Sequence, residues 1–188
     1  MAANNESRPS QSGMHYSTEG EKAYKAGQYA QAAEQYAEAE RQFSAAGDPL
    51  KAAEMANNRS VALLQAGRPE EALTAAQGTE AVFAQGSDTF RQALALGNQA
   101  AALEALTRED EALKKYWQCS DLLKQIGEKE YRATVLKSIS ALQIRTGKQF
   151  EALASMDAAL ENQKKLSVME RFLKKLLDIP MRMLRGRK

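Results

Sequence analysis

One eight-residue pattern recurs four times along the chain at a constant interval. It reads AGRPEEAL at 66–73, AGQYAQAA at 26–33, LTREDEAL at 106–113 and TGKQFEAL at 146–153. Two series of small residues keep a spacing of 40 residues: Ala32, Ala72, Ala112 and Ala152, and then Ala39, Thr79, Cys119 and Ala159. Self-similarity at a period of about 20 to 50 residues indicates a protein built from stacked repeats. This period constrains the fold more than any other feature of the sequence.

Each block contains a helical stretch, a short break and a second helical stretch. The breaks fall at Gly27, Gly67, Thr107 and Gly147. Glycine adopts the left-handed conformation that closes a helix at little steric cost, so three breaks carry the expected residue and Thr107 departs from it. The small residues after each break are expected where the two helices of a hairpin cross. Because one hairpin cannot bury its apolar face alone, neighbouring hairpins are expected to stack.

The chain is predicted to be all-α, because valine and isoleucine occur only four times each and no stretch alternates with the period-two pattern of a strand. We expect a disordered polar tail at 1–13, a capping helix at 167–179 and a basic tail at 180–188. The four hairpins are expected at 14–47, 48–87, 88–127 and 128–166. Within the second hairpin, the second helix is expected to run without interruption over 69–85.

Polar residues and glycines mark the borders between blocks. Asp48 before Pro49 is expected to cap a helix start, and Ser87 or Asp88 to cap the next. Glycine is expected to end the preceding helix at Gly47 and at Gly86.

The C-terminal segment combines a helix start with an apolar stripe and many basic residues. Ser167 and Glu170 form a capping box, and Pro180 is expected to end the helix that follows. The apolar stripe consists of Val168, Phe172, Leu173, Leu176 and Leu177. Residues 164–188 hold nine Lys or Arg and two acids, a balance of +7. This helix is expected to cap the open end of the stack, which stacked repeats commonly require.

The repeat pattern resembles that of the tetratricopeptide repeat family over roughly residues 14–165. The length of the repeat is similar to the extended type found in kinesin light chains. The matching positions are Gly20, Tyr24, Gly27, Tyr29, Ala32, Tyr36 and Ala39 in the first block; Asn58, Leu63, Gly67, Ala72 and Thr79 in the second; Asn98, Ala100, Leu103, Ala112, Tyr116 and Cys119 in the third; and Gly147, Phe150, Ala152 and Ala159 in the fourth. Arg59, Gln99 and Gln143 stand where the family usually has an apolar or aromatic residue.

The resemblance implies a right-handed superhelical solenoid whose concave groove is lined by the first helix of each hairpin. It also implies a protein interaction scaffold that binds a peptide or helix of another protein in that groove. Carried over to this sequence, the groove residues are Glu21, Tyr24, Lys25, Asn57, Asn58, Val61, Leu64, Gln65, Asn98, Ala101, Glu104, Ala105, Lys137, Ala141, Ile144 and Arg145. Asparagine amides there can hold a peptide backbone, although Asn58 and Asn98 also fit a purely structural role.

The residues give no support for catalysis, a cofactor or a metal site. Nucleotide-binding, zinc-protease and nucleophile-elbow motifs are all missing from the sequence. His15 is the only histidine and Cys119 the only cysteine, which leaves no metal pair and no internal disulfide. No run of 18 apolar residues and no signal peptide is found, so we expect a cytoplasmic, non-enzymatic protein.

Two alternatives remain open beside the scaffold hypothesis. The net charge of +2 gives no reason to expect a nucleic-acid partner for the whole chain. The basic C-terminal segment is nevertheless of the kind that attaches to anionic membranes or nucleic acid. Its proposed contact residues are Lys174, Lys175, Arg182, Arg185, Arg187 and Lys188. Self-association through an open end of the stack is the second alternative.

Overall fold

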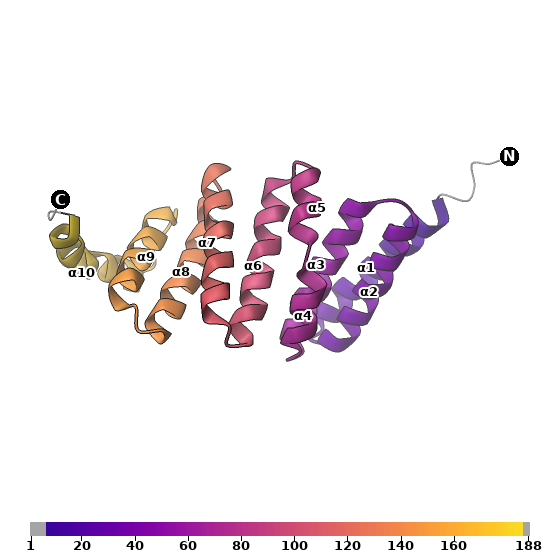
Figure 1. The fold of residues 1–188 in the computed structure, drawn as a ribbon, viewed down its shortest axis with the longest axis horizontal. Helices are drawn as coiled ribbons and strands as arrows, with labels where there is room; N and C mark the ends of the chain where they lie inside the picture. The colour runs from indigo at the N-terminus through magenta and orange to yellow at the C-terminus, as the bar shows by residue number, and fades with distance from the viewer. Residues whose placement is uncertain (1–6, 186–188) are drawn as a thin grey trace. The chain divides into compact units, whose positions relative to one another are not determined.

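The computed structural model describes residues 7–185, with side chains described for residues 9–177, and it is all-α within that range. The chain forms two compact units, Met1–Arg108 and Glu109–Lys188, here called unit 1 and unit 2. Unit 1 contains α1 (Ser7–Lys25), α2 (Tyr29–Ala45), α3 (Pro49–Gln65), α4 (Pro69–Ala76), α5 (Thr79–Gln85) and α6 (Thr89–Ala105). Unit 2 contains α7 (Glu109–Gln125), α8 (Lys129–Arg145), α9 (Gln149–Asn162) and α10 (Val168–Arg185) (Figure 1).

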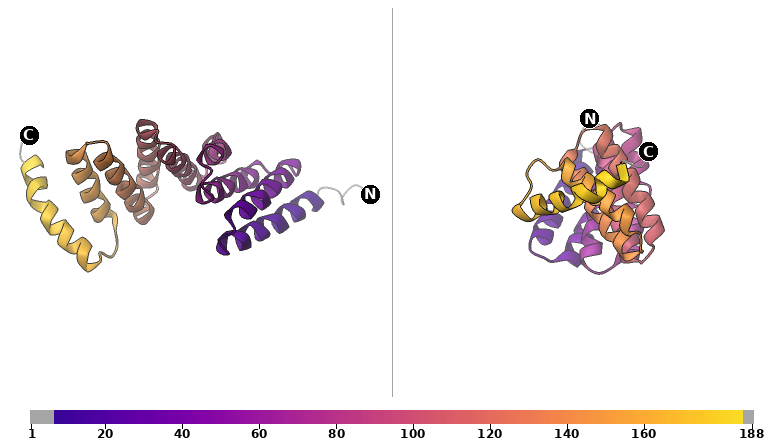
Figure 2. Two further views of the ribbon diagram at one scale, coloured as in Figure 1. Left: turned by 90° about the horizontal axis from the view of Figure 1, so that it is seen from below. Right: turned by 90° about the vertical axis from the view of Figure 1, so that its left-hand side faces the viewer.

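Within each unit, consecutive helices pack against each other as hairpins. In unit 1, α2 lies between α1 and α3, and α6 packs against α3, α4 and α5. In unit 2, α8 packs against both α7 and α9 (Figure 2). This arrangement confirms the prediction of stacked helical hairpins inside each unit.

The breaks between the helices of a hairpin occur where the sequence places them. Gly27, Gly67, Thr107 and Gly147 all have positive φ angles. In the first break, the Gln28 N–H donates to the Ala23 carbonyl over 2.9 Å, and the same six-residue closure recurs at the other three. This bond satisfies a carbonyl that the helix end would otherwise leave unpaired.

The border between the second and third hairpins differs from the prediction. Asp88, not Ser87, caps α6, because its Oδ1 accepts from the Arg91 N–H over 2.9 Å. The left-handed residue there is Ser87, with φ of 57°, and Gly86 has an ordinary φ of −77°. A Cβ at Gly86 would lie 2.6 Å from Leu50 Cδ2. Gly86 is therefore required for packing and not for ending the helix.

The first helix begins earlier than predicted, because α1 already starts at Ser7. Residues 7–13, expected to be disordered, form the start of this helix, and residues 1–6 lie outside the described part of the chain. Gly13 is buried against Phe43, whose ring lies 3.0 Å from where a Cβ would stand. Gly20 approaches Tyr36 in the same way, at 2.8 Å. The polar composition hid this contact, because glycines contribute shape to the packing without apolar side chains.

The prediction of one continuous helix over 69–85 is wrong, because this stretch forms two helices, α4 and α5. Gln77 is extended and Gly78 is left-handed, with φ of 81°. A continuous helix would pair the Ala76 carbonyl with an N–H four residues on. Here that carbonyl accepts from Thr79 Oγ1 over 2.7 Å and from Gln99 Nε2 over 2.9 Å. Position 99 is usually apolar in the tetratricopeptide pattern. A glutamine is suitable here because the break between α4 and α5 leaves the Ala76 carbonyl in need of a hydrogen-bond donor.

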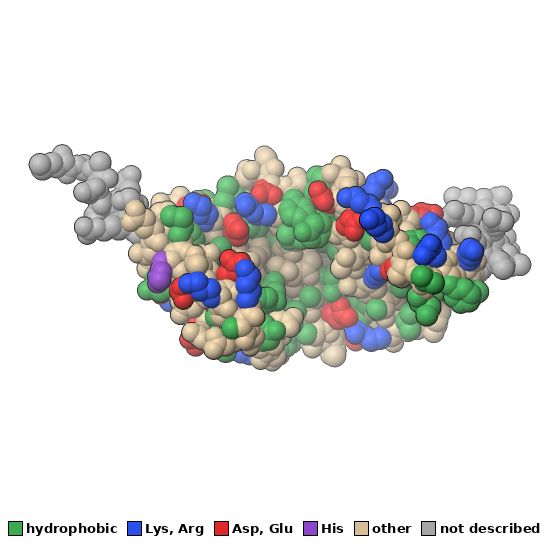
Figure 3. Space-filling model, turned by 180° about the vertical axis from the view of Figure 1, so that it is seen from behind, with side chains coloured by type: hydrophobic (Ala, Val, Ile, Leu, Met, Phe, Trp, Pro, Cys, Tyr) green, Lys and Arg blue, Asp and Glu red, His purple; other side chains and the backbone are tan. Residues whose placement is uncertain are grey.

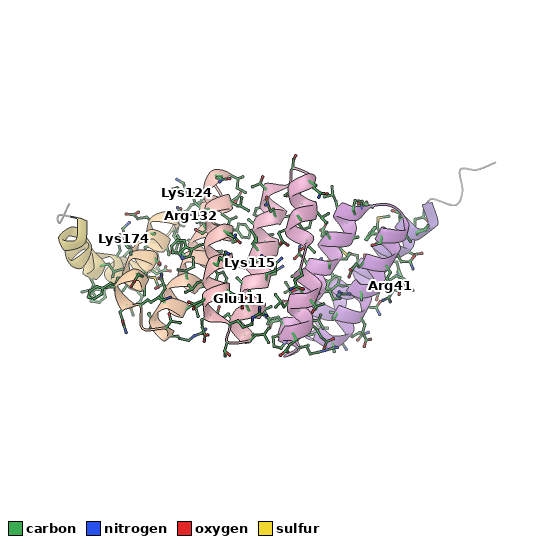
Figure 4. All side chains as sticks on the ribbon, in the orientation of Figure 1. Arg41, Glu111, Lys115, Lys124, Arg132 and Lys174 are labelled. Atoms are coloured by element: carbon green, nitrogen blue, oxygen red, sulfur yellow. The ribbon has the colours of Figure 1, made fainter. Side chains whose placement is uncertain are left out.

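Polar contacts also join the helices of unit 2. Arg132 on α8 donates from Nε to Ser120 Oγ over 3.3 Å and from its guanidinium to Asn162 Oδ1 over 3.2 Å (Figure 4). Buried Gln143 accepts from Ser155 Oγ over 2.7 Å. Both contacts cross between helices, so Arg132 and Gln143 are paired with neighbouring helices of the unit.

The last helix starts as predicted but ends later. The Glu170 N–H donates to Ser167 Oγ over 3.2 Å, and the Ser167 N–H donates to Glu170 Oε2 over 2.9 Å, which confirms the capping box. Contrary to the prediction of an end at 179, α10 continues through Pro180 to Arg185. The proline costs a helix about 3 kcal/mol, which is not enough to end this one.

Candidate functional site

A cavity of about 240 Å³ opens between α3 and α6 of unit 1. Its lining is polar at the sides and apolar at the base: Glu54, Asn57, Asn58 and Val61 from α3, Phe83 from α5, and Arg91, Leu94 and Asn98 from α6. The α3 residues stand at spacings of three, four and seven, and the α6 residues at three and seven. Such spacings place side chains on one face of a helix, which explains why both sets point into one space.

Three asparagine side chains form the polar part of the cavity. Asn57 Oδ1 accepts from Asn98 Nδ2 over 3.3 Å. Thr79 Oγ1 lies 3.4 Å from the same oxygen, but its one hydrogen is donated to the Ala76 carbonyl at 2.7 Å. The Nδ2 of Asn57 and the Oδ1 of Asn98 take no part in these bonds. The Asn58 side chain makes no hydrogen bond among the residues that the structure describes. The cavity therefore presents amide donors and acceptors with hydrogen-bonding capacity to spare.

The charged residues of the cavity neutralise one another. The Arg91 guanidinium lies 3.5 Å from Glu54 Oε2 and 3.1 Å from Asp88 Oδ2. One cation therefore stands between two carboxylates, one of which also caps α6. A ligand's free carboxylate would gain little here, because the cation already has anionic partners.

The apolar side chain of Phe83 connects the cavity lining to the hydrophobic core. Phe83 is fully buried and packs with Ala53 and Ala95 in a core cluster, against which Leu50 and Val82 also pack. Close-packed interiors of this kind hold their shape when a ligand side chain enters.

A second hollow of unit 1 is lined by residues that form ion pairs. One of about 310 Å³ is lined by Arg59, Arg68 and Glu71 among others. Arg68 pairs with Glu71 over 2.6 Å, and Arg59 pairs with Glu40 over 3.0 Å. Arg59 Nε is nevertheless buried without a hydrogen-bond partner among the described residues. We select the asparagine-lined cavity, although it is the smaller of the two, because three of the residues predicted from the sequence line it.

No protein-family model and no curated protein matches this chain. The site therefore has to be interpreted from its own chemistry.

Of the residues predicted to line a groove, the structure brings Asn57, Asn58 and Asn98 together, with Val61 beside them. Leu64, Gln65 and Glu104 belong to α3 and α6 but do not line this cavity. Tyr24 packs edge-on against Tyr29 across the first turn, at 5.3 Å between ring centroids, and Lys25 pairs with Glu21.

The remaining predicted groove residues belong to unit 2. Lys137 Nζ lies 2.6 Å from Glu170 Oε1, so α10 already occupies its charge. Ile144 and Arg145 are exposed near the end of α8. Among the predicted anion contacts, Lys174 is half-buried and Lys175 is exposed. Arg182, Arg185, Arg187 and Lys188 lie outside the described side chains.

The sequence prediction missed Glu54, Phe83, Arg91 and Leu94. For three of them a signal was present, because Glu54 precedes Asn57 and Asn58 by one helical turn, and Arg91 and Leu94 precede Asn98 by two turns and one. Phe83 gave no such signal, since it enters the site only through the tertiary packing of α5.

The side chains described, those of residues 9–177, include no group of three or more His, Cys, Asp or Glu that could hold a metal ion. Cys119 is buried in α7, and His15 is exposed on α1. No helix in the described part of the chain combines the length and apolar character needed to cross a bilayer.

Proposed function

We propose that this chain is a non-enzymatic scaffold of the tetratricopeptide type that binds an extended segment of another protein. The proposal includes the right-handed superhelical stacking and the concave groove of that family. The single observation that carries it is the convergence of Asn57, Asn58 and Asn98 around an apolar-based cavity on the first helices of two successive hairpins.

The hydrogen-bonding pattern suits a peptide backbone. An extended peptide alternates N–H donors and C=O acceptors, and an asparagine side chain can satisfy one of each. Asn58 and the spare atoms of Asn57 and Asn98 provide donors and acceptors on both sides of the cavity. The backbone of a ligand passing between α3 and α6 can therefore be held without regard to its sequence.

The size and charge of the cavity further restrict the class of ligand that it can bind. Small-molecule and cofactor sites commonly measure about 300 to 1,000 Å³. At about 240 Å³ this cavity is below that range and suits one inserted apolar side chain, which would contact Val61, Leu94 and Phe83. Because Arg91 is neutralised, the bound segment is expected to be uncharged at this point and not a chain terminus.

The test is a peptide-display selection on the immobilised full chain, followed by fluorescence polarisation with the selected peptides. We expect the Asn58→Ala, Asn98→Ala double variant to bind about tenfold or more weakly, because it loses hydrogen bonds worth about 0.5 to 1.5 kcal/mol each. Gln31→Ala, which removes an exposed amide from α2, is the matched control and should bind like the wild type.

Thermal unfolding of both variants separates a binding defect from a folding defect. The proposal is wrong if selected peptides bind the double variant as tightly as the wild type while it remains folded. It is also wrong if selection enriches no peptide over an unrelated helical protein.

A further inference from the structure

The helix α10 carries an apolar face that the described part of the chain leaves uncovered. Val168, Phe172 and Leu176 follow one another at intervals of four, so they form one row along the helix. Their exposed fractions are 76%, 59% and 54%, and neighbouring Met169 is 74% exposed. Soluble proteins seldom expose several large apolar side chains in one contiguous patch unless the patch binds something.

The packing of α10 explains why this row stays exposed. Leu177 is buried and Leu173 half-buried, so a neighbouring stripe of the helix is the one that contacts α9. Glu170 fixes the start of α10, because its carboxylate accepts from Lys137 Nζ over 2.6 Å and from Gln163 Nε2 over 3.1 Å. The hydrogen bonds that Glu170 accepts, chiefly from Lys137, lower its pKa to about 2, so this anchor is ionised at neutral pH.

Basic side chains border the apolar row. Arg171 and Lys175 are exposed one turn apart on the side of the row away from Leu173 and Leu177, and Lys164 and Lys165 are exposed just before the helix. Apolar and basic side chains gather at the C-terminal end of unit 2 in Figure 3. The one acid on the described side chains of α10, Glu170, is engaged by Lys137.

We propose that this face of α10 binds the surface of an anionic lipid bilayer. A helix with apolar side chains on one face and Lys or Arg beside them lies in the plane of the membrane interface. Its apolar row enters the acyl boundary while its cations contact lipid phosphates or carboxylates. Each basic residue near such a surface strengthens binding about fivefold at low salt. The basic side chains and the exposed apolar row would then both contact the same partner, the anionic bilayer.

Two other partners satisfy only half of this pattern. Nucleic acid would use the cations through its phosphates but would leave Val168, Phe172 and Leu176 without a contact. A second copy paired face to face through α10 would cover the apolar row but would bring Arg171 and Lys175 of both chains together. The anionic bilayer is complementary to both features.

The test is co-sedimentation of the full chain with vesicles of phosphatidylcholine containing about one third phosphatidylserine, compared with pure phosphatidylcholine. We expect binding to the anionic vesicles only, weakening as salt is raised. Phe172→Ser with Leu176→Ser should reduce binding more than tenfold. Arg171→Gln with Lys175→Gln should reduce it about 25-fold at low salt and less at high salt.

Matched controls come from unit 1. Met14→Ser removes a side chain that is 51% exposed, and Arg41→Gln with Lys51→Gln removes two exposed cations. Both controls should sediment with anionic vesicles as the wild type does. Since every substituted side chain is largely exposed, the variants are expected to fold, and thermal unfolding checks this.

The proposal is overturned if the full chain does not sediment with anionic vesicles, or if the Phe172→Ser, Leu176→Ser variant still does so fully. Retention of a labelled DNA duplex that is unaffected by the two serines would assign the basic segment to nucleic acid. Light scattering that shows dimers, dissociated by the two serines, in a protein that ignores vesicles would assign the face to a second copy. None of these results depends on Asn58 or Asn98, so the peptide proposal stands or falls separately.

Discussion

The second helices of the second and third hairpins occupy equivalent places in the repeat but differ in continuity. In unit 2, α7 runs unbroken from Glu109 to Gln125, whereas the matching stretch of unit 1 is divided into α4 and α5. Shifted by 40 residues, Gly78 corresponds to Gln118 and Gln99 to Ile139. The interruption is therefore paired with a polar residue on the next helix, and the intact helix with an apolar one.

The hydrogen bonds explain this pairing. Gln99 Nε2 donates to the Ala76 carbonyl over 2.9 Å and to Glu80 Oε2 over 2.6 Å. Ile139 is fully buried in unit 2, next to a helix whose own backbone pairs its carbonyls. A break in one helix thus creates a requirement for a donor on its neighbour.

The first hairpin shows a third solution at the same place. Arg59 and Glu40, which correspond to Gln99 and Glu80, form an ion pair of 3.0 Å. One position of the repeat therefore carries a charged pair, an amide contact or an apolar contact. The continuity of the preceding helix does not decide this by itself, because α2 and α7 are both unbroken.

The largest effect on stability is expected when the glutamine found at position 99 of unit 1 is introduced at the equivalent position 139 of unit 2. Ile139→Gln should lower the free energy of unfolding by about 3 to 5 kcal/mol, because it removes a buried apolar side chain and buries an amide that finds no freed carbonyl. Urea unfolding followed by the fluorescence of Trp117, the only tryptophan, measures this. Ile144→Gln, at a 58% exposed position of the same helix, should change stability by less than about 0.5 kcal/mol. If Ile139→Gln and Ile144→Gln lowered the free energy of unfolding equally, the apolar contact at position 139 would not be specific to packing against the continuous helix α7.

The reverse exchange should have a smaller effect. Gln99→Ile should cost about 1 to 3 kcal/mol, because Ala76 keeps its bond from Thr79 but loses the amide donor. Circular dichroism melts of this variant and of Gln85→Ile, an exposed control on α5, measure the difference. An unchanged melting temperature for Gln99→Ile would show that the amide contact does not support the break.

Smaller effects are expected at the break itself. Gly78→Ala should cost about 1 to 2 kcal/mol, because alanine is strained at a φ of 81°. Gln118→Gly, at the matching position of α7, should cost about 1 kcal/mol through helix propensity alone. Hydrogen exchange should show α7 still continuous in that variant. If glycine at 118 divides α7, the local sequence decides the break without help from Gln99.

The smallest effect concerns the charged member of the series. Burial raises the pKa of Glu40, and this outweighs the opposing positive charges of Arg59 and Arg41. A carboxyl whose folded pKa is raised gains stability for the folded chain as pH falls and loses it as pH rises through that pKa. The stability of the wild type relative to Glu40→Gln should therefore increase between pH 7 and pH 4, measured by urea unfolding.

Glu38 provides the control of opposite sign. Hydrogen bonds from Gln42 and Arg41 lower its pKa, so its contribution is present above its unfolded pKa and lost as pH falls through the folded one. The wild type should therefore lose stability relative to Glu38→Gln on acidification. If both variants shift in the same direction, the burial of Glu40 is not what raises its pKa.

The local features of this fold were predictable because they depend on neighbours in the chain. The left-handed breaks and the capping box follow from residues a few positions apart, and the structure contains them. The three asparagines of the cavity were also named from the sequence, through the resemblance of the first helices of the hairpins to the tetratricopeptide pattern.

Tertiary contacts decided the rest. The division of α4 from α5 depends on Thr79 and on Gln99, which lies on a different helix, and the early start of α1 depends on Gly13 and Phe43. Phe83 lines the cavity because α5 packs beside α3 and α6. Lys137, predicted to line the groove, instead pairs with Glu170, which is distant in the chain. The period and spacing of the sequence determine where helices form and which residues share a face. Which polar group is paired, and which apolar face stays exposed, is decided only when another helix packs against it.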